Sequence, residues 1–336
     1  MAQCSFFSFL FDSNNAKSSP IGAAKKYKND YLENDKERQY LELIMSIGEL
    51  EYATDITNIS FLQTSLAKSG FTDGSNRQGY MGVRGVGYGN VAASVSAPFT
   101  EKIKLGAKVT GINYEDSSNV IITYTQGGAT RSVDTRTVVL TVSLGVLKKR
   151  TISFTPTLPT SKLEVIDKMG YGTLNKCIMQ WNKRDAIVWP EDKQWFELLS
   201  SEKAGKWATF FNPTKFKGVP TLVGWIGGKA AWEMELKTDD EIIEDVMLNL
   251  REMFPNITNP DRVIISRWGV TDNIHGTYSH KKINRSRSSD ASELRERVGN
   301  VFFAGEATAK SWYATCIGAW NSGEEAALGM IDLLKN

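Results

Sequence analysis

The sequence predicts an α/β fold with mixed sheets, and three features of the chain predict it. Alternating or continuous apolar runs, separated by glycine and polar turns, occur in both halves and are typical of strands. Apolar residues spaced three and four apart indicate amphipathic helices at 35–50 and 239–254. Near the C-terminus, a short apolar run ends in glycine and leads into a further helix. Strands joined by helices in this way favour two α/β regions, as does a length of 336 residues at about 150 residues per domain.

The first region begins with a helix, because Tyr40, Leu43, Ile44 and Ile47 fall on one helical face. The continuous apolar run 138–142 predicts a strand buried on both faces. The predicted elements of this region are helices at 35–50 and 90–99 and strands at 108–115, 120–126, 130–134 and 138–142.

The second region contains the most clearly delimited helix of the chain. Asp239 is its candidate N-cap, Pro255 ends it, and an apolar stripe from Ile242 to Leu250 predicts which face is buried. The other predicted elements are helices at 161–169 and 318–334 and strands at 171–181, 207–211, 221–225, 263–268 and 300–304.

Composition excludes several classes of protein. Lys and Arg number 40 against 38 Asp and Glu, so a net charge of +2 gives no electrostatic case for nucleic acid or a membrane surface. Three widely spaced cysteines exclude a disulfide framework, and two histidines without a Cys-x-x-Cys pair argue against a metal site. No apolar run approaches the ~18 residues of a membrane-spanning helix, and the N-terminus lacks a basic signal-peptide region. We therefore expect a soluble cytoplasmic protein; its oligomeric state does not follow from the sequence.

The strongest chemical signal is the segment 301–308 followed by 318–327. A buried strand ends at Gly305, and Glu306 faces whatever lies at the strand end, where α/β sheets bind their ligands. Small residues at Gly318 and Ala319 then open a helix, whose N-terminal N–H groups suit an anion. A plain strand–loop–helix with a capping glutamate is the alternative that spacing alone favours.

At these residues the chain resembles the C-terminal FAD motif of the flavin-dependent amine oxidases, which include polyamine oxidases, monoamine oxidases and lysine-specific histone demethylases. Further blocks resemble the family in the same order, and the resemblance runs from Arg38 to Leu334. In the first of these blocks Ser143 stands where many members have proline. The blocks are 141–148, 152–159, 169–176, and 266–268 with 276–279.

The resemblance implies the two-domain FAD-dependent amine oxidase fold with a mixed-sheet substrate domain. It implies oxidation of an amine, polyamine as first choice, to an imine and aldehyde, with O2 reduced to hydrogen peroxide, as in polyamine catabolism. The partners would be a small-molecule amine and O2. FAD would be non-covalent, because the loop 273–279 has no cysteine where monoamine oxidases attach it. The implied division is 1–34 unassigned, 35–84 as the helical part of the substrate domain, 85–150 as FAD-binding, 151–261 as substrate domain, and 262–336 as the C-terminal FAD-binding part.

Lys176 is the implied catalytic residue, linked through water to flavin N5 and aiding reoxidation by O2. The two-residue period of a strand places it on one face with Leu174 and Ile178, where an ammonium is costly without a partner. The alternative is a lysine on an edge strand with its ammonium in water. The implied cofactor-binding residues are Val109, Trp268, Gly305, Glu306, Thr315, Cys316, Gly318 and Ala319. The implied substrate residues are Asp55, Trp312 and Tyr313, with a solvated loop acid as the favoured alternative for Asp55.

One family element is missing from the sequence. Members begin with a strand, G-x-G-x-x-G and a helix that cradle the pyrophosphate, and the glycine cluster 85–89 does not have that spacing. We therefore expect an N-terminally truncated fold that, expressed alone, binds FAD weakly or not at all. Two alternatives stay open: a non-catalytic remnant or fragment acting as a binding module, and a histone-lysine demethylase-like oxidase. The basic residues between 281 and 297 are expected on a solvated face.

Overall fold

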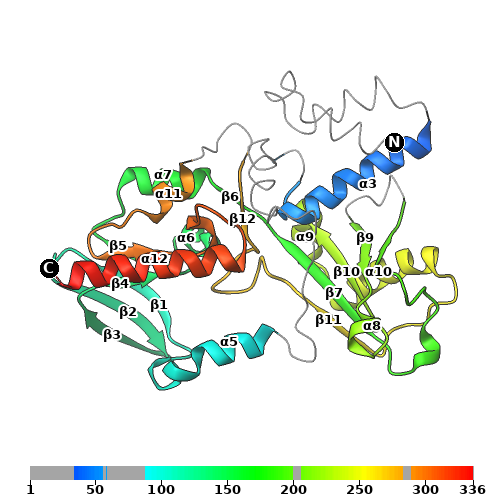
Figure 1. Ribbon diagram of the computed structural model, residues 1–336, viewed down its shortest axis with the longest axis horizontal. Helices are drawn as coiled ribbons and strands as arrows, with labels where there is room; N and C mark the ends of the chain where they lie inside the picture. Colours follow the sequence, from blue (N-terminus) through cyan, green and yellow to red (C-terminus); the bar gives the residue numbers. More distant parts are fainter. Residues whose placement is uncertain (1–33, 56–57, 59–87, 200–205, 283–288, 336) are drawn as a thin grey trace, which may run out of the picture. The chain divides into compact units, whose positions relative to one another are not determined.

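The computed structural model describes residues 34–55, 58, 88–199, 206–282 and 289–335. The chain divides into two compact units, each built from two separate stretches (Figure 1). Unit 1 comprises Met1–Ala67 and Lys168–Arg287, and unit 2 comprises Lys68–Asp167 and Ser288–Asn336. None of the described helices is long and apolar enough to cross a lipid bilayer.

Unit 1 is organised around a five-stranded sheet in the order β11-β7-β10-β9-β8. Every neighbouring pair in it is antiparallel; β8, β9 and β10 follow one another in the chain, whereas β7 pairs with β10 and β11 across long stretches of sequence. Side chains alternate across β7, so Cys177 and Met179 are fully buried while Lys176 and Ile178 lie half-buried on the opposite face. The strands are β7 (Leu174–Gln180), β8 (Trp195–Glu197), β9 (Lys206–Phe211), β10 (Thr221–Gly227) and β11 (Arg262–Ile265).

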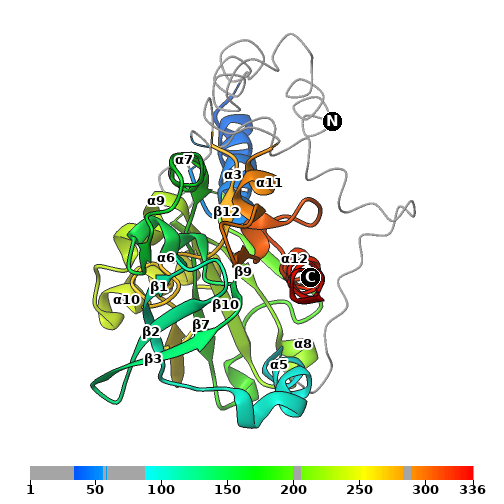
Figure 2. The ribbon, with the colours of Figure 1, turned by 90° about the vertical axis from the view of Figure 1, so that its left-hand side faces the viewer.

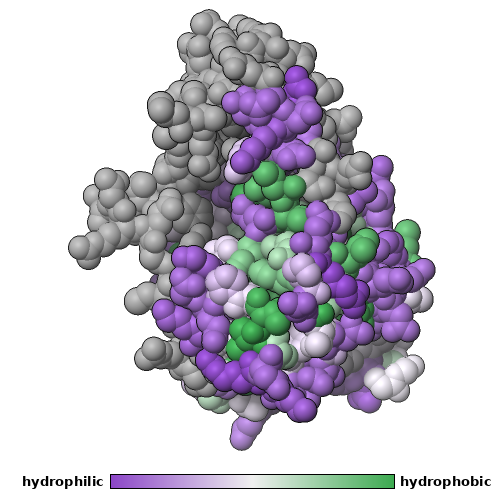
Figure 3. Space-filling model, turned by 90° about the vertical axis from the view of Figure 1, so that its right-hand side faces the viewer, coloured by the Kyte–Doolittle hydropathy of each residue, from purple (hydrophilic) through white to green (hydrophobic). Residues whose placement is uncertain are grey.

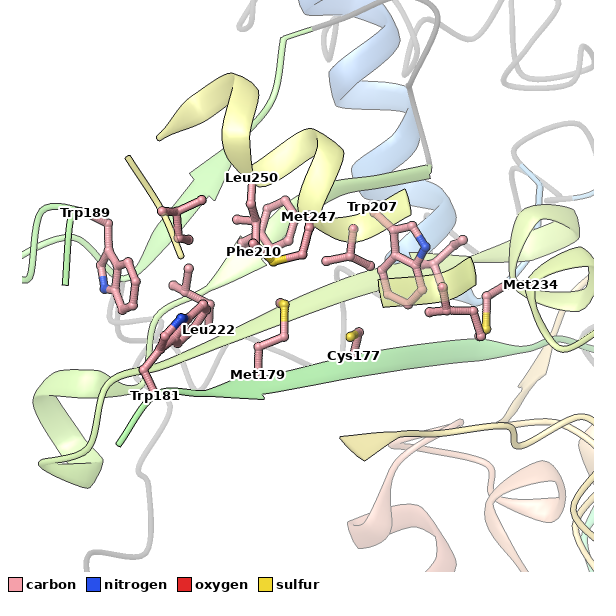
Figure 4. Packing of buried hydrophobic residues seen from close by; sticks show 14 of the residues in the cluster. Cys177, Met179, Trp181, Trp189, Trp207, Phe210, Leu222, Met234, Met247 and Leu250 are labelled. Carbon is pink, nitrogen blue, oxygen red and sulfur yellow. The ribbon is translucent and has the colours of Figure 1, made fainter. Parts of the chain in front are cut away.

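The core of unit 1 lies between this sheet and the helix α10 (Asp239–Met253). Met247 and Leu250 of the helix point towards Met179 and Leu222 of the strands (Figure 4). The N-cap of α10 is Thr238, whose hydroxyl accepts the Glu241 N–H while the Glu241 carboxylate accepts the Thr238 N–H. The expectation that Asp239 caps this helix is therefore wrong by one residue.

One group of contacts in unit 1 lies at the start of β7. The helix α3 (Asp35–Tyr52) ends there, and the Tyr278 hydroxyl lies 2.9 Å from both the Leu50 and Glu51 carbonyls at its last turn. The Ala53 carbonyl then accepts the Thr173 N–H at 2.8 Å. The other elements are α8 (Thr214–Lys217), α9 (Gly228–Met234), the short helix η3 (Arg184–Ala186) and the pair β6 (Gly170–Tyr171) with β12 (Ser279–His280).

Unit 2 contains a mixed four-stranded sheet in the order β3-β2-β1-β5 and a separate parallel pair, β13 with β4. Figure 2 shows the strands β1, β2 and β3 of the sheet side by side. The C-terminal helix α12 (Cys316–Lys335) packs on the parallel pair through Ala326, which clusters with Phe302 and Ala304. The strands are β1 (Lys108–Asn113), β2 (Val120–Gln126), β3 (Ala129–Thr135), β4 (Val138–Leu140), β5 (Ser153–Thr155) and β13 (Val301–Phe303). The other helices are α5 (Tyr88–Ser96), η2 (Ala97–Lys102), α6 (Leu144–Lys149), α7 (Thr160–Lys168), α11 (Asp290–Arg295) and η4 (Glu306–Thr308).

A buried lysine joins the two stretches of unit 2. Lys162 on α7 is 4% exposed, and its ammonium donates to the carbonyls of Glu293, Leu294 and Glu296 at 2.8, 2.9 and 2.5 Å. The same ammonium lies 4.5 Å from the centroid of the Phe303 ring. Burial lowers the pKa of Lys162 to about 8. These carbonyls lie at the end of α11, so Lys162 ties α7 to that helix and to β13.

The two compact units are not the expected domains, whose boundaries stay a prediction. Residues 151–167 belong with unit 2, because β5 pairs in parallel with β1. Residues 262–287 belong with unit 1, because β11 pairs with β7 and β12 with β6. Which unit binds FAD and which binds substrate stays a prediction.

Two local expectations are also corrected. The strand β4 covers only three residues and its first two are half-buried, so it is not buried on both faces throughout. Lys281 is 2% exposed and does not lie on a solvated face. Arg285, Arg287 and the start of the 85–89 glycine cluster lie outside the described residues.

The face in Figure 3 is mostly hydrophilic, with apolar side chains gathered near its centre.

Candidate functional site

Lys176 lies on a central strand of unit 1, because β7 is flanked by β11 and β10. The edge-strand alternative is therefore wrong. Its ammonium lies 4.5 Å from the ring centroid of Trp225, its register partner on β10. Burial lowers the pKa of Lys176, because the charged form loses water. Lys176 is thus a half-buried amine held over an aromatic ring on the sheet face opposite the core.

Trp268 follows β11 and is linked to Lys176 through hydrogen bonds. The Trp268 N–H donates to Asn175 Oδ1 at 3.1 Å, and Ser266 Oγ donates to the same oxygen at 3.0 Å. Ser266 Oγ also accepts the Lys176 N–H at 2.8 Å. The Trp268 side chain is 39% exposed, so it is available for contact. The structure therefore brings these two predicted residues into one polar cluster.

Asp55 has a local role that the sequence did not reveal. Its Oδ1 accepts the Lys229 N–H at 2.8 Å, in the first turn of α9. Gly228, at a φ of +62°, admits this approach, since a Cβ there would lie 2.6 Å from Asp55 Oδ1. Asp55 therefore caps a helix from a distant part of the chain and is more than a solvated loop acid.

We expect Asp55→Ala to lower the free energy of unfolding by about 0.5–2 kcal/mol, the usual cost of losing a capping side chain. Asp55→Asn keeps an acceptor oxygen, Oδ1 of the amide, and should lower the free energy of unfolding much less. Urea titration of both variants measures the difference. Equal losses in the two variants would contradict capping through this oxygen and leave the negative charge itself as the relevant property.

In unit 2, the turn after β13 is shaped by Gly305 and Ser322. Gly305 has a φ of +130°, a region that favours glycine, and a Cβ there would meet nothing within 4 Å. The Ser322 hydroxyl, from α12, accepts the Gly305 N–H at 2.9 Å and lies 3.1 Å from its carbonyl. Glu306 follows, half-buried, as the first residue of η4. The strand end is therefore fixed against the helix while open space remains above Gly305.

The helix α12 begins at Cys316, two residues before the expected start at Gly318. Thr315 Oγ1 accepts the Gly318 N–H at 3.1 Å and so caps the first turn. The N–H groups of Cys316 and Ile317 come earlier in that turn, where no intrahelical carbonyl can accept them. They are the donors that this helix can offer an anion.

Gly318 is buried against the preceding loop. A Cβ at Gly318 would lie 2.2 Å from the Trp312 carbonyl oxygen and 2.9 Å from Ala309 Cβ. The loop itself is tight, because Trp312 and Ala314 both have φ values near +60°. Because Gly318 has no side chain, the backbone of the loop can pack directly against it, a contact that the sequence did not indicate.

The other predicted residues all lie in unit 2. Val109 is half-buried on β1 and pairs with Tyr124. Trp312 is 37% exposed, and Tyr313 is half-buried with its hydroxyl inside the protein. Cys316 is exposed and Ala319 half-buried on the first turn of α12.

The donor set in unit 2 fits a flavin. The uncapped N–H groups of Cys316 and Ile317 suit a group whose reduced form carries negative charge, as that of a flavin does. Within the described ranges, no cluster of His, Cys, Asp and Glu is arranged to hold a metal ion.

The family model of flavin-containing amine oxidoreductases matches residues 24–331. The chain belongs to this family. Polyamine oxidase 5 of Oryza sativa subsp. japonica is 32% identical over 306 residues, covering 89% of this chain and 57% of that protein. Histone demethylase-like protein A of Aspergillus fumigatus is 35% identical over 210 residues, covering 58% of this chain and 19% of that protein. The chain thus spans about half, or less, of these relatives.

Solved structures agree on the fold. Wild-type putrescine oxidase bound to putrescine has a TM-score of 0.75 at 18% identity, over 95% of this chain and 69% of that one. Cyclohexylamine oxidase from Brevibacterium oxydans has a TM-score of 0.68 at 19% identity, over 100% and 74%. The predicted α/β amine oxidase fold and membership of the flavin-containing family are confirmed. The expectation that this chain, expressed alone, binds FAD weakly stays a prediction. The individual roles of the site residues stay predictions.

Sequence reasoning missed the partners that hold the site residues. Trp225 could have been found, since strand alternation places it on the face of β10 opposite its buried neighbours. Asn175, Ser266 and Ser322 are short polar residues with no local signal. Glu235 follows α9 and reads as an ordinary surface acid, yet it is 7% exposed.

Proposed function

We propose that the protein oxidises an amine, with a polyamine as the first choice of substrate, and that O2 is reduced to hydrogen peroxide. The observation that carries the proposal is the half-buried Lys176 amine, held over Trp225 on a strand whose backbone is linked through Ser266 and Asn175 to the Trp268 turn. Matches to polyamine oxidases over two-thirds or more of this chain support the substrate class. The redox chemistry would come from FAD, as acceptor of the hydride from the carbon next to the amine and as donor of two electrons to O2.

The chain's own residues would orient the reactants and stabilise the negative charge that develops during the reaction. The Lys176 ammonium would hold a water molecule and stabilise the negative charge that develops on oxygen as it is reduced. The N-terminus of α12 would stabilise the negative charge of the reduced flavin through the Cys316 and Ile317 N–H groups. The substrate enters as the unprotonated amine, so no side-chain base is required for its oxidation.

The remaining roles are assigned by matching positions in the family. Val109 would contact the adenine through its backbone, and Trp268 would lie beside the flavin ring. Trp312 and Tyr313 would border the substrate, and Asp55 would attract its cationic end. Further FAD contacts are assigned to Gly305, Glu306, Thr315, Cys316, Gly318 and Ala319.

A second candidate is oxidation of methylated lysine in a histone tail. The histone demethylase relatives favour it, with 35–36% identity over 55–59% of this chain. The two candidates share the chemistry and differ in the substrate, so one assay separates them.

The experiment measures amine-dependent hydrogen peroxide formation by the FAD-loaded protein. Putrescine, spermidine and spermine are compared with a dimethyl-lysine histone peptide, and the same protein without amine serves as control. We expect turnover with at least one polyamine. Turnover with the peptide alone would establish the second candidate, and no turnover with any amine at full flavin occupancy would contradict both.

A further inference from the structure

Four consecutive residues after β11, Ser266 to Gly269, are each anchored by a hydrogen bond or ion pair to another part of unit 1. Ser266 bonds to Asn175 and to the Lys176 N–H, and the Trp268 N–H donates to Asn175. The Arg267 guanidinium meets the Asp239 carboxylate at 2.6 Å and the Lys237 carbonyl at 3.0 Å. The Gly269 N–H donates to Glu235 Oε1 at 2.7 Å.

Glu235 and Asn175 connect these anchors at the centre. Asn175 Nδ2 donates to Glu235 Oε1 at 2.6 Å, so one carboxylate oxygen holds both the Asn175 amide and the Gly269 N–H. Asn175 is fully buried and Glu235 is 7% exposed. Glu235 Oε2 is buried without a hydrogen-bond partner. A buried acid with one oxygen unpartnered costs free energy, which the two hydrogen bonds at Oε1 offset only in part.

The turn packs so closely against Trp232 and Glu235 that only glycine fits at position 269. A Cβ on Gly269 would lie 2.6 Å from Glu235 Oε2 and 2.2 Å from the Trp232 ring. The Trp268 carbonyl accepts the Gly276 N–H at 2.9 Å, which holds the far side of the turn. The backbone on either side of the Trp268 side chain is therefore fixed by several independent hydrogen bonds.

We propose that Asn175 and Glu235 are positioning residues, which hold the strand that carries Lys176 and the turn that carries Trp268 in one fixed arrangement. Asn175 precedes Lys176 in β7 and accepts from Trp268, so it touches both sides directly. Glu235 orients the Asn175 amide and closes the turn at Gly269. The inference rests on the proposed function for the catalytic meaning of Lys176 and Trp268, while the fixed arrangement itself is a property of unit 1.

The test follows the Lys176 amine directly. Lysines are reductively dimethylated with ¹³C-labelled formaldehyde and a borane as hydride donor, which preserves their charge, and the Lys176 methyl signal is assigned by its loss in Lys176→Arg. The Trp225 ring beneath that amine should shift the signal upfield. Hydrogen exchange of the Gly269 amide reports the turn. Neither measurement needs flavin or substrate. The positioning role can therefore be tested even if the protein does not oxidise amines.

In Glu235→Ala, we expect the ring-shifted Lys176 signal to move towards the other lysines and the Gly269 amide to exchange about tenfold faster or more. Glu235→Gln keeps an acceptor oxygen and should retain most of the shift. The matched control is Glu233→Ala, because Glu233 lies two residues away and is exposed. If Glu235→Ala does not fold, Ser266→Ala removes the acceptor of the Lys176 N–H and should give the same change in the signal.

A folded Glu235→Ala or Ser266→Ala protein that melts at a lower temperature, with the Lys176 signal unmoved, would overturn the proposal. That outcome would leave the two residues with a packing role alone.

Discussion

In the complete protein with FAD bound, Lys176→Met is expected to slow the reaction of the reduced flavin with O2 by about 10²–10³-fold, the usual cost of removing one preorganised donor from developing negative charge. The reduction of the flavin by amine should slow far less, because that step places no new negative charge beside the ammonium. Methionine keeps the length and apolar contacts of the side chain, so Trp225 should stay covered. Stopped-flow measurement of the two half-reactions separates them.

Lys183→Met is the matched control, because Lys183 is exposed just after the same strand. It should leave both half-reactions unchanged. An equal loss in both half-reactions of Lys176→Met, or no loss in either, would refute the role of the ammonium in oxygen reduction.

The face of β7 that carries Lys176 was predictable, and its surroundings were not. The two-residue period places Leu174, Lys176 and Ile178 together, as the structure confirms. Flanking of β7 by β11 depends on pairs such as Val263 with Met179, far apart in sequence. No local pattern encodes a pairing at that separation, so an edge strand and a central strand looked alike.

The hydrogen-bond partners of the site residues were also not predictable, because they are far apart in the sequence. Asn175 and Ser266 are 91 residues apart, and Asn175 and Glu235 are 60 apart. Each is an ordinary polar residue until the fold brings it beside the others. Periodicity finds faces of helices and strands, whereas a buried hydrogen-bond cluster has no period in the sequence.

Helix ends were misplaced for a related reason. Thr238 and Asp239 are both good caps by type, and only the reciprocal bond with Glu241 selects Thr238. At α12, the small residues Gly318 and Ala319 looked like a helix start suited to close approach. The loop before them contains Trp312 and Ala314 in the left-handed region, which side chains seldom adopt. That unusual turn starts the helix earlier, at Cys316.

Gly318→Val is expected to damage both the loop and flavin binding. A Cβ at Gly318 meets the Trp312 carbonyl at 2.2 Å, and backbone cannot rotate away as a flexible side chain would. We expect the free energy of unfolding to fall by about 1–3 kcal/mol or more, as for other overpacked sites. Gly323→Val is the control, since a Cβ there meets nothing within 4 Å and valine forms helix at least as well as glycine.

The same displacement should reach the flavin through the first turn of α12. If the loop pushes Cys316 and Ile317 away, the reduced flavin loses a favourable dipole of about 0.3–2 kcal/mol, so FAD binds less tightly and becomes harder to reduce. Titration of the apoprotein and redox potentiometry measure the two effects. Lower stability with an unchanged potential would show that Gly318 serves the loop alone. If Gly318→Val also binds FAD fully, the flavin does not contact this helix. The assignment of Cys316, Gly318 and Ala319 to the cofactor would then be refuted.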